Sequence, residues 1–184
     1  MPILNSLLLD ADIVVFSYEL ELWEALKERH KIAVVGTVVN EAQFFEPSTG
    51  GRGGGINLQR QASRGEIEVL EATSEEIVRT FADFSPAFLA QLHDGEKEAI
   101  ALVHSGRFAD FVFCTGDINA IQAMGMLALP RSLSFQEIVE SLGTDFHVSR
   151  PLRASLTKRT HDIHYEKGKA RRISEEYFIR SPLR

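Results

Sequence analysis

Short apolar runs alternate along this chain with segments of helical periodicity. The runs at 3–10, 31–36 and 111–115 are rich in leucine, valine and isoleucine or phenylalanine, which is typical of strands buried on both faces. Between the first two runs, apolar residues recur at helical spacing from Ile13 to Trp23. Because consecutive parallel strands need a long crossover, usually a helix, this alternation predicts an α/β fold with a mostly parallel central sheet.

The remaining elements follow from turn and capping signals. We expect further strands at 67–70 and 127–129, and helices at 12–29, 37–45, 74–81, 85–92, 94–104, 117–124 and 134–142. Residues 47–55 contain five glycines, which predicts a loop without regular structure. We therefore assign residues 1–145, including the Gly-rich loop 47–55, to one domain and residues 146–184 to a C-terminal extension.

Composition narrows the class of protein. With 184 residues and 44% hydrophobic residues, the chain can form a real core. The single cysteine, Cys114, excludes an intramolecular disulfide framework and suits a reducing compartment. No apolar run reaches the length of a membrane span, and the leucine-rich start lacks the features of a signal peptide. We therefore expect a cytoplasmic protein that does not enter a membrane.

Charge is distributed unevenly along the chain. The net charge is −6, but residues 146–184 contain ten of the 20 Lys and Arg and only four of the 26 Asp and Glu, so the extension carries +6 and residues 1–145 carry −12. A basic extension can contact nucleic acid, an acidic protein partner or the acidic body itself, and the sequence leaves these three open. The candidate nucleic-acid-binding residues are Lys158, Arg159, Lys167, Lys169, Arg171 and Arg172.

Acidic residues follow the predicted strands. Asp10 ends the first strand and Asp117 follows the strand at 111–115, while Glu41 and Glu98 each lie about one turn into a predicted helix. Ligands of open α/β sheets gather at the carboxyl ends of the strands, so the four acids can converge there. Such a cluster is unfavourable unless a cation lies among the carboxylates, and Mg²⁺ and Mn²⁺ prefer carboxylate and water oxygens.

The helix at 94–104 offers more than one acid. Glu96 and Glu98 are two residues apart, so they point about 200° away from each other and cannot both bind the same metal directly. Asp94 and Glu98 are four residues apart and share a face. We favour Glu98 as the ligand, with Asp94 or Glu96 as a supporting or capping acid.

Four motifs in this order resemble those of the PIN-domain nucleases, which include the VapC-type toxins of bacterial toxin–antitoxin pairs. They are Leu-Leu-Leu-Asp-Ala-Asp at 7–12, Val-Val-Asn-Glu at 38–41, Gly-Glu-Lys-Glu-Ala-Ile-Ala-Leu at 95–102 and Thr-Gly-Asp-Ile-Asn at 115–119. The resemblance covers about residues 3–142 and departs from the usual family pattern at Asp12, Glu98 and Asn119. These departures leave the exact ligand set open.

The resemblance implies a three-layer PIN-like sandwich and a Mg²⁺- or Mn²⁺-dependent endoribonuclease. It implies that Asp10, Glu41, Glu98 and Asp117 hold the metal and its attacking water, and that Thr115 and Asn119 support them by hydrogen bonds, with Asp12 beside them. A toxin role would add an antitoxin or other protein partner. A homodimer is a further expectation, separate from the resemblance.

Two other interpretations compete with the nuclease. The motif Asp10-Ala11-Asp12 also resembles the start of haloacid-dehalogenase-like phosphatases, with Asp10 as the nucleophile and Asp12 as the general acid and base. The later aspartate of that family is missing here, and Lys97 is only a weak match to its lysine. The second alternative is a PIN-like body without catalysis that binds nucleic acid or protein.

Overall fold

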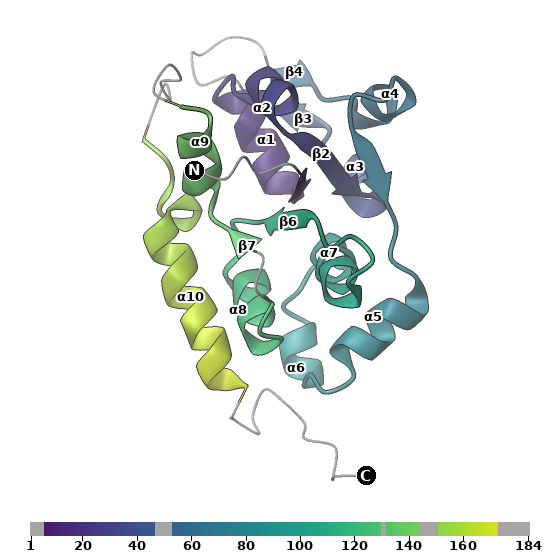
Figure 1. The fold of residues 1–184 in the computed structure, drawn as a ribbon, viewed down its shortest axis with the longest axis vertical. Helices are drawn as coiled ribbons and strands as arrows, with labels where there is room; N and C mark the ends of the chain where they lie inside the picture. Colours follow the sequence, from purple (N-terminus) through teal and green to yellow (C-terminus); the bar gives the residue numbers. More distant parts are fainter. Residues whose placement is uncertain (1–5, 47–52, 130–131, 144–150, 173–184) are drawn as a thin grey trace.

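The computed structural model describes residues 6–46, 53–129, 132–143 and 151–172. It contains a five-stranded, all-parallel sheet with the order β5-β2-β1-β6-β7 (Figure 1). The strands are β1 (Ser6–Leu9), β2 (Lys31–Val35), β5 (Glu68–Leu70), β6 (Phe111–Cys114) and β7 (Ser132–Leu133). The predicted α/β fold is confirmed, with helices flanking the sheet.

The central strands have apolar side chains on both faces. Leu7 of β1 pairs with Ile32 of β2 on one side and with Val112 of β6 on the other, and all three are buried. Burial on both faces is the expected environment of a parallel sheet with helices on either side. The alternation of apolar runs and helical segments in the sequence therefore predicted the arrangement of sheet and helices correctly.

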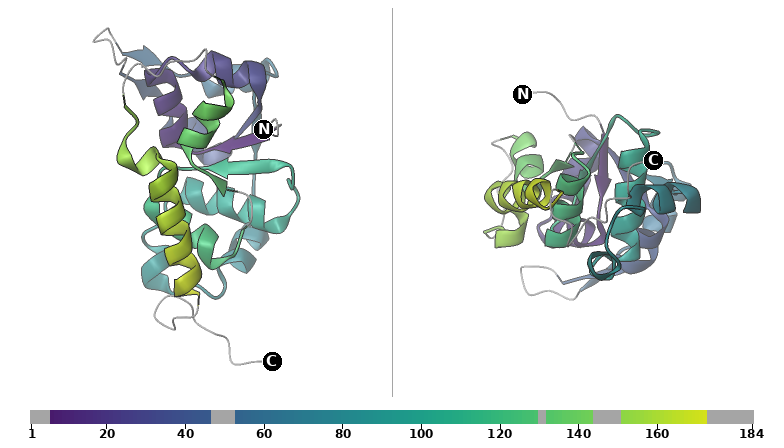
Figure 2. Two further views of the ribbon diagram at one scale, coloured as in Figure 1. Left: turned by 60° about the vertical axis from the view of Figure 1, so that its left-hand side comes forward. Right: turned by 90° about the horizontal axis from the view of Figure 1, so that it is seen from below.

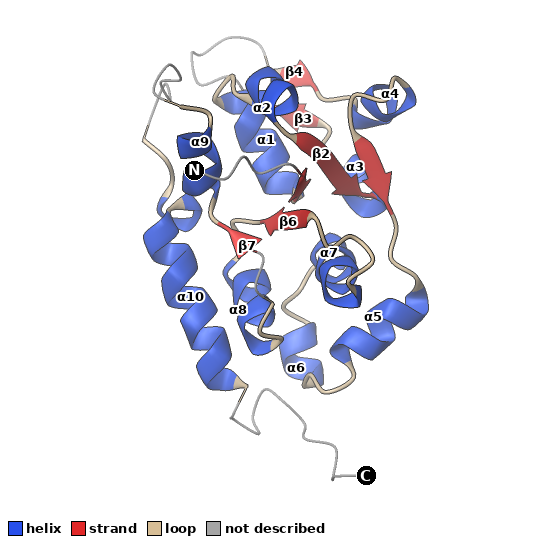
Figure 3. Cartoon of the chain, in the orientation of Figure 1, coloured by secondary structure: helices blue, strands red, loops and turns tan. Residues whose placement is uncertain are grey.

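Helices cover both faces of this sheet (Figures 1 and 3). One face carries α1 (Ala11–Glu19) and α2 (Trp23–Arg29), and the other carries α7 (Asp94–Ser105) and α8 (Ile118–Met126). The single helix expected at 12–29 is broken into α1 and α2 at Glu21, which has a φ of 60°. After the break, the side chains of Leu22 and Trp23 point into the core, where both are almost fully buried.

The region from 36 to 66 differs most from the prediction. The helix expected at 37–45 ends early, as α3 (Gly36–Glu41), and is followed by β3 (Phe44–Phe45). Most of the expected Gly-rich loop, residues 47–52, lies outside the described ranges. At its end the prediction is wrong, because β4 (Gly54–Gly55) pairs antiparallel with β3. A helix that we did not predict, α4 (Leu58–Ser63), comes next.

The shorter helices lie within the ranges predicted for them, although Thr73 and not Ser74 caps the first. They are α5 (Ser74–Phe81), α6 (Pro86–Leu89) and α9 (Phe135–Ser141), and Pro86 occupies the first turn of α6 as expected. The strand predicted at 127–129 is wrong. Those residues form the turn after α8, in which Ala128 has a φ of 53°, and the last strand is β7.

The C-terminal extension packs against the body. A short 3₁₀ helix, η1 (Ala154–Leu156), leads into α10 (Lys158–Arg171), which runs alongside α8 (Figure 2). A Cβ at Gly168 of α10 would lie 2.1 Å from the carbonyl oxygen of Gln122, so the two helices touch backbone to backbone. Within the described ranges, no helix is long and apolar enough to cross a membrane.

Candidate acidic site

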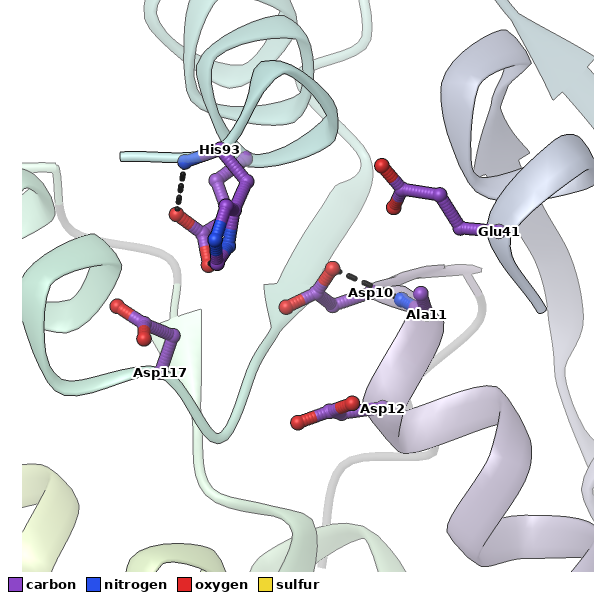
Figure 4. A pocket seen from close by; sticks show the side chains of 7 residues that line it. Asp10, Ala11, Asp12, Glu41, His93 and Asp117 are labelled. Atoms are coloured by element: carbon purple, nitrogen blue, oxygen red, sulfur yellow. Dashed lines mark hydrogen bonds and ion pairs between the residues drawn. The ribbon is translucent and has the colours of Figure 1, made fainter. Parts of the chain in front are cut away.

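A small pocket opens at the carboxyl ends of β1 and β6, the edge of the sheet at which we expected the site. Its volume is about 120 Å³. The residues that line it come from the starts of α1, α7 and α8 and from the end of α3 (Figure 4): they are Asp10, Ala11, Asp12, Glu41, His93, Glu96 and Asp117. Five of these seven side chains are carboxylates. Three of the four predicted ligands, Asp10, Glu41 and Asp117, are therefore brought together.

Asp10 is the most constrained of these acids. It follows β1 directly and caps α1, with its Oδ1 accepting a hydrogen bond from the Ala11 amide at 2.8 Å. Its Oδ2 accepts a hydrogen bond from the Thr115 hydroxyl at 2.6 Å. Burial, with smaller contributions from the nearby Asp12 and Asp117 carboxylates, raises the pKa of Asp10 to about 6, and the two hydrogen bonds only partly offset this rise.

Thr115 connects the two aspartates of the pocket. Its hydroxyl donates to Asp10 and also accepts a hydrogen bond from the Asp117 amide at 3.0 Å. Asp117 in turn caps α8, with Oδ1 accepting from the amides of Asn119 and Ala120. The hydrogen-bonding role expected for Thr115 is thus present. Asn119 contributes its backbone amide, and its side chain lies 3.5 Å from the Gln91 carbonyl oxygen instead of lining the pocket.

The structure brings to the pocket a different acid of α7 from the one that we favoured. Glu96 lines the pocket, whereas Glu98 lies on another face of the helix and does not. The Glu98 carboxylate accepts a hydrogen bond from the Thr37 hydroxyl at 2.9 Å and lies 3.4 Å from the Ala72 amide. Asp94 is also outside the pocket, where it forms an exposed ion pair with Lys97.

Glu96 reaches the pocket because of its position in the first turn of α7. It is the third residue after His93, which caps this helix, and its carboxylate bends back to accept a hydrogen bond from the His93 amide at 2.9 Å. This capping-box arrangement directs the side chain toward the helix start, and an acid three residues after the cap is its signal in the sequence. From the sequence, we named Glu96 only as an alternative supporting or capping acid, and we missed His93.

The environment of Glu96 disfavours its charged form. The side chain is only 4% exposed, and burial together with Asp117 and Asp10 raises its pKa to about 7. The imidazole Nδ1 of His93 lies 3.5 Å from Glu96 Oε1, and it compensates the charge only when protonated. The buried half of the pocket therefore gathers carboxylates whose charge the protein does not neutralise.

Glu41 and Asp12 form the exposed rim of the pocket. Glu41 approaches the start of α7 at Gly95, where a Cβ would lie 3.4 Å from Glu41 Oε2. Figure 4 shows the side chains of Glu41 and Asp12 on opposite sides of Asp10.

The C-terminal extension supports the loop that carries Asp117. Leu156 of η1 is buried against Gly116, where a Cβ would lie 2.9 Å from Leu156 Cδ2. Arg153 stacks on Phe16 of α1 with its guanidinium carbon 4.0 Å from the ring centre. The extension thus contacts two of the elements that shape the pocket, although none of its own residues lines it.

The donor set fits a hard divalent cation, with one restriction on how the ion would be held. No lysine or arginine lines the pocket, and Lys97, which the phosphatase alternative requires, pairs with Asp94 instead. Across the described residues, no three His, Cys, Asp or Glu side chains lie close enough together to hold one metal ion. The pocket therefore fits an ion that keeps several waters and binds one or two carboxylates directly, as Mg²⁺ usually does.

The basic residues of the extension divide into two groups. Lys158 pairs with Glu137 at 2.9 Å, Lys169 pairs with Glu166 at 2.7 Å, and Arg171 contacts the Gln122 side chain. Arg159, Lys167 and Arg172 are exposed on the surface of α10 or at its end. All six lie outside the acidic pocket, so a role in RNA binding would be separate from it.

No protein-family model matches the chain, and searches of curated proteins and of solved structures found no match. The resemblance to PIN-domain nucleases therefore stays a prediction from the motifs at 7–12, 38–41, 95–102 and 115–119.

Proposed function

We propose that this protein is a Mg²⁺- or Mn²⁺-dependent endoribonuclease of the PIN-like type. The observation that carries the proposal is the convergence of five carboxylates from four helices on one pocket that contains no lysine or arginine. Asp10 and Glu96 are buried close together, which raises the free energy of their ionised forms. A bound cation would offset this electrostatic cost, so the arrangement favours a cation site. The motif resemblance adds the reaction and the substrate, hydrolysis of RNA.

The residues of the pocket would have different tasks. Asp10 and Asp117 are fixed by hydrogen bonds from Thr115 and from helix amides, so they present carboxylate oxygens at defined positions for the metal. Glu96 and Glu41 would hold and orient the attacking water or the waters around the metal. When bound, a divalent ion lowers the pKa of a water and offsets the charge that develops on the phosphodiester.

Proton balance in the pocket also favours this proposal. Without a cation, the raised pKa values of Asp10 and Glu96 mean that the pocket takes up protons near neutral pH. A cation would favour the ionised carboxylates, so metal binding should release protons and should strengthen as the pH rises from 5 to 8. Calorimetric titration of the protein with Mn²⁺ alone, in buffers of different ionisation enthalpy, measures this release.

The decisive experiment compares two glutamates of the same helix. Glu96→Gln and Glu98→Gln are the same chemical change two residues apart, but only Glu96 lines the pocket. With a single-stranded RNA and Mg²⁺ or Mn²⁺, we expect Glu96→Gln, Asp10→Asn and Asp117→Asn each to lower kcat/KM by about 100-fold or more, because loss of metal charge stabilisation is worth several kcal/mol. Glu98→Gln should retain activity within about fivefold if it folds, which circular dichroism checks.

Two results would overturn the proposal: a wild-type protein that cleaves no RNA with either metal, and an Asp117→Asn variant as active as the wild type. Activity that survives in Glu96→Gln but is lost in a folded Glu98→Gln would instead restore Glu98 as the functional acid of α7.

A further inference from the structure

A second, larger depression is lined, like the acidic pocket, by residues at the end of α3. Its volume is about 550 Å³, and it lies among α3, the β3–β4 ribbon and the start of α4, which are grouped at one end of the molecule in Figure 1. Glu41 belongs to the acidic pocket, whereas its neighbours Asn40 and Gln43 line this groove. The two sites therefore meet at the end of one helix.

The lining of the groove is neutral. Buried Ile56 and Leu58 supply an apolar floor. Four exposed amide residues surround it: Asn40, Gln43, Asn57 and Gln59. No charged side chain is among the lining residues, so the groove suits an uncharged, flat and hydrogen-bonding group better than a phosphate.

Phe44 is the exposed aromatic residue of this groove. It is 74% exposed, the highest value of any large hydrophobic residue in the described part of the chain, whereas the neighbouring Phe45 packs on Tyr18 with ring centres 5.3 Å apart. An apolar ring so exposed costs solvation free energy, and a planar partner that stacks on it would recover that energy.

The strand opposite Phe44 leaves its ring uncovered. In the β3–β4 ribbon, Phe44 pairs with Gly55 and Phe45 pairs with Gly54. A Cβ at Gly54 would lie 2.5 Å from the Phe45 ring, so packing demands a glycine there. A Cβ at Gly55 would meet no atom within 4 Å, so packing does not require glycine at this position, and its missing side chain leaves space beside Phe44.

We propose that this groove binds an unpaired nucleobase of the RNA substrate, with the base stacked on Phe44 and its edge hydrogen-bonded by amides such as Gln43 and Asn40. The proposal rests on the ribonuclease function proposed above and adds a preference for single-stranded RNA. Aromatic stacking and amide contacts to base edges are how proteins recognise splayed single-stranded bases, and a base inside a duplex could not enter the groove. The shared end of α3 would place the adjoining phosphodiester toward the acidic pocket.

Binding and cleavage are measured separately to test this. In the Asp117→Asn background with Mg²⁺, a fluorescein-labelled single-stranded RNA of about ten nucleotides and its duplex are titrated by anisotropy. We expect Phe44→Ala to weaken single-strand binding about tenfold, since stacking of one base is worth 1–3 kcal/mol. Val78→Ala, which removes an equally exposed apolar group on α5, should change affinity less than twofold, and duplex binding should be weak and insensitive to Phe44.

Gly55→Thr provides a variant that loses binding without losing stability. The new side chain would occupy the space beside Phe44, while a β-branched residue favours the strand, so the urea midpoint should hold or rise as affinity falls at least fivefold. Unchanged single-strand affinity in both Phe44→Ala and Gly55→Thr would overturn the groove proposal, as would preferential duplex binding or a dimer that Phe44→Ala converts to monomers.

The two proposals fail in different ways. If wild-type protein binds single-stranded RNA through Phe44 but cleaves none, the groove proposal stands and the nuclease proposal falls. If wild-type protein cleaves RNA and Phe44→Ala cleaves and binds equally well, the nuclease proposal stands and the groove proposal falls.

Discussion

The two ends of helix α8 are organised by opposite physical rules. At its start, Asp117 faces Asp10 and Glu96 in a pocket of like charges, and two of these carboxylates have strongly raised pKa values. Farther along, α8 packs against α10 at Gly125 and Gly168, and the Gln122 side chain of α8 hydrogen-bonds with His164 and Arg171 of α10. The comparison indicates that like charges cost stability at the pocket, whereas close packing stabilises the same helix within about two turns of Asp117.

The extension links these two regions. α10 packs on α8, and the η1 segment before it places Leu156 against Gly116, next to Asp117. The described part of the extension, residues 151–172, is thus a layer of the folded body. A truncated 1–145 chain would expose part of α8 and remove the support of the Asp117 loop, so it is a poor test of RNA binding by the basic residues.

The largest expected effect is on the pH dependence of the unfolding free energy, which the buried carboxylates of the pocket control. Because the pKa of Asp10 is about 6 in the folded protein and 3.8 ordinarily, the folded state holds this proton more tightly than the unfolded state. The resulting stabilisation is complete below about pH 4 and is lost as the pH rises through 6, and Glu96 extends the loss to about pH 7. The difference in unfolding free energy between Asp10→Asn and wild type should therefore shift by about 3 kcal/mol in favour of the variant between pH 4 and pH 8.

Urea unfolding at pH 4, 6 and 8 in the presence of EDTA measures this gain. Glu75→Gln, an exposed acid of α5 outside the pocket, is the matched control and should follow the wild-type profile. Parallel pH profiles for wild type and Asp10→Asn would contradict a strained pocket, and the contrast between the two ends of α8 would then disappear.

A somewhat smaller effect is expected at the interface of α8 and α10. Gly168→Ala places a methyl group 2.1 Å from the Gln122 carbonyl oxygen, so the helices must separate. Although alanine favours a helix over glycine by about 1 kcal/mol, overpacking against backbone should leave a net loss of about 2 kcal/mol. The urea midpoint measures it, and Gly55→Ala, where a Cβ meets nothing within 4 Å, should change stability little. A stable Gly168→Ala would mean that α10 is only loosely attached.

The smallest expected effect tests whether charge or packing attaches α10. Lys158 pairs with Glu137 and Asp162, but it is half exposed, and such pairs contribute about 0.5 kcal/mol. Lys158→Gln should therefore lower the unfolding free energy by about that amount, and the difference should shrink in 1 M NaCl. A loss larger than that of Gly168→Ala would show that ion pairs hold the extension in place.

Local patterns predicted some of these features and missed others. The acids after β1 and β6 were identified because a strand end can be read from a few residues, and parallel strands bring such ends to one edge. Glu96 was set aside in favour of Glu98, since helical periodicity separates the two residues but does not say which face meets the pocket. The β3–β4 ribbon and α4 were missed because five glycines between 47 and 55 conceal the pairing of Phe44 with Gly55.

The sequence by itself determined the α/β class, the central strands and the positions of Asp10, Glu41 and Asp117 at strand ends or one turn into a helix. These features depend on periodicity and on residues close together in the chain. Only the tertiary structure decided that Glu96 and His93 complete the pocket, that Leu156 supports it and that α10 is part of the body. Those results depend on which faces of distant elements touch, and that choice is made by packing of the whole chain.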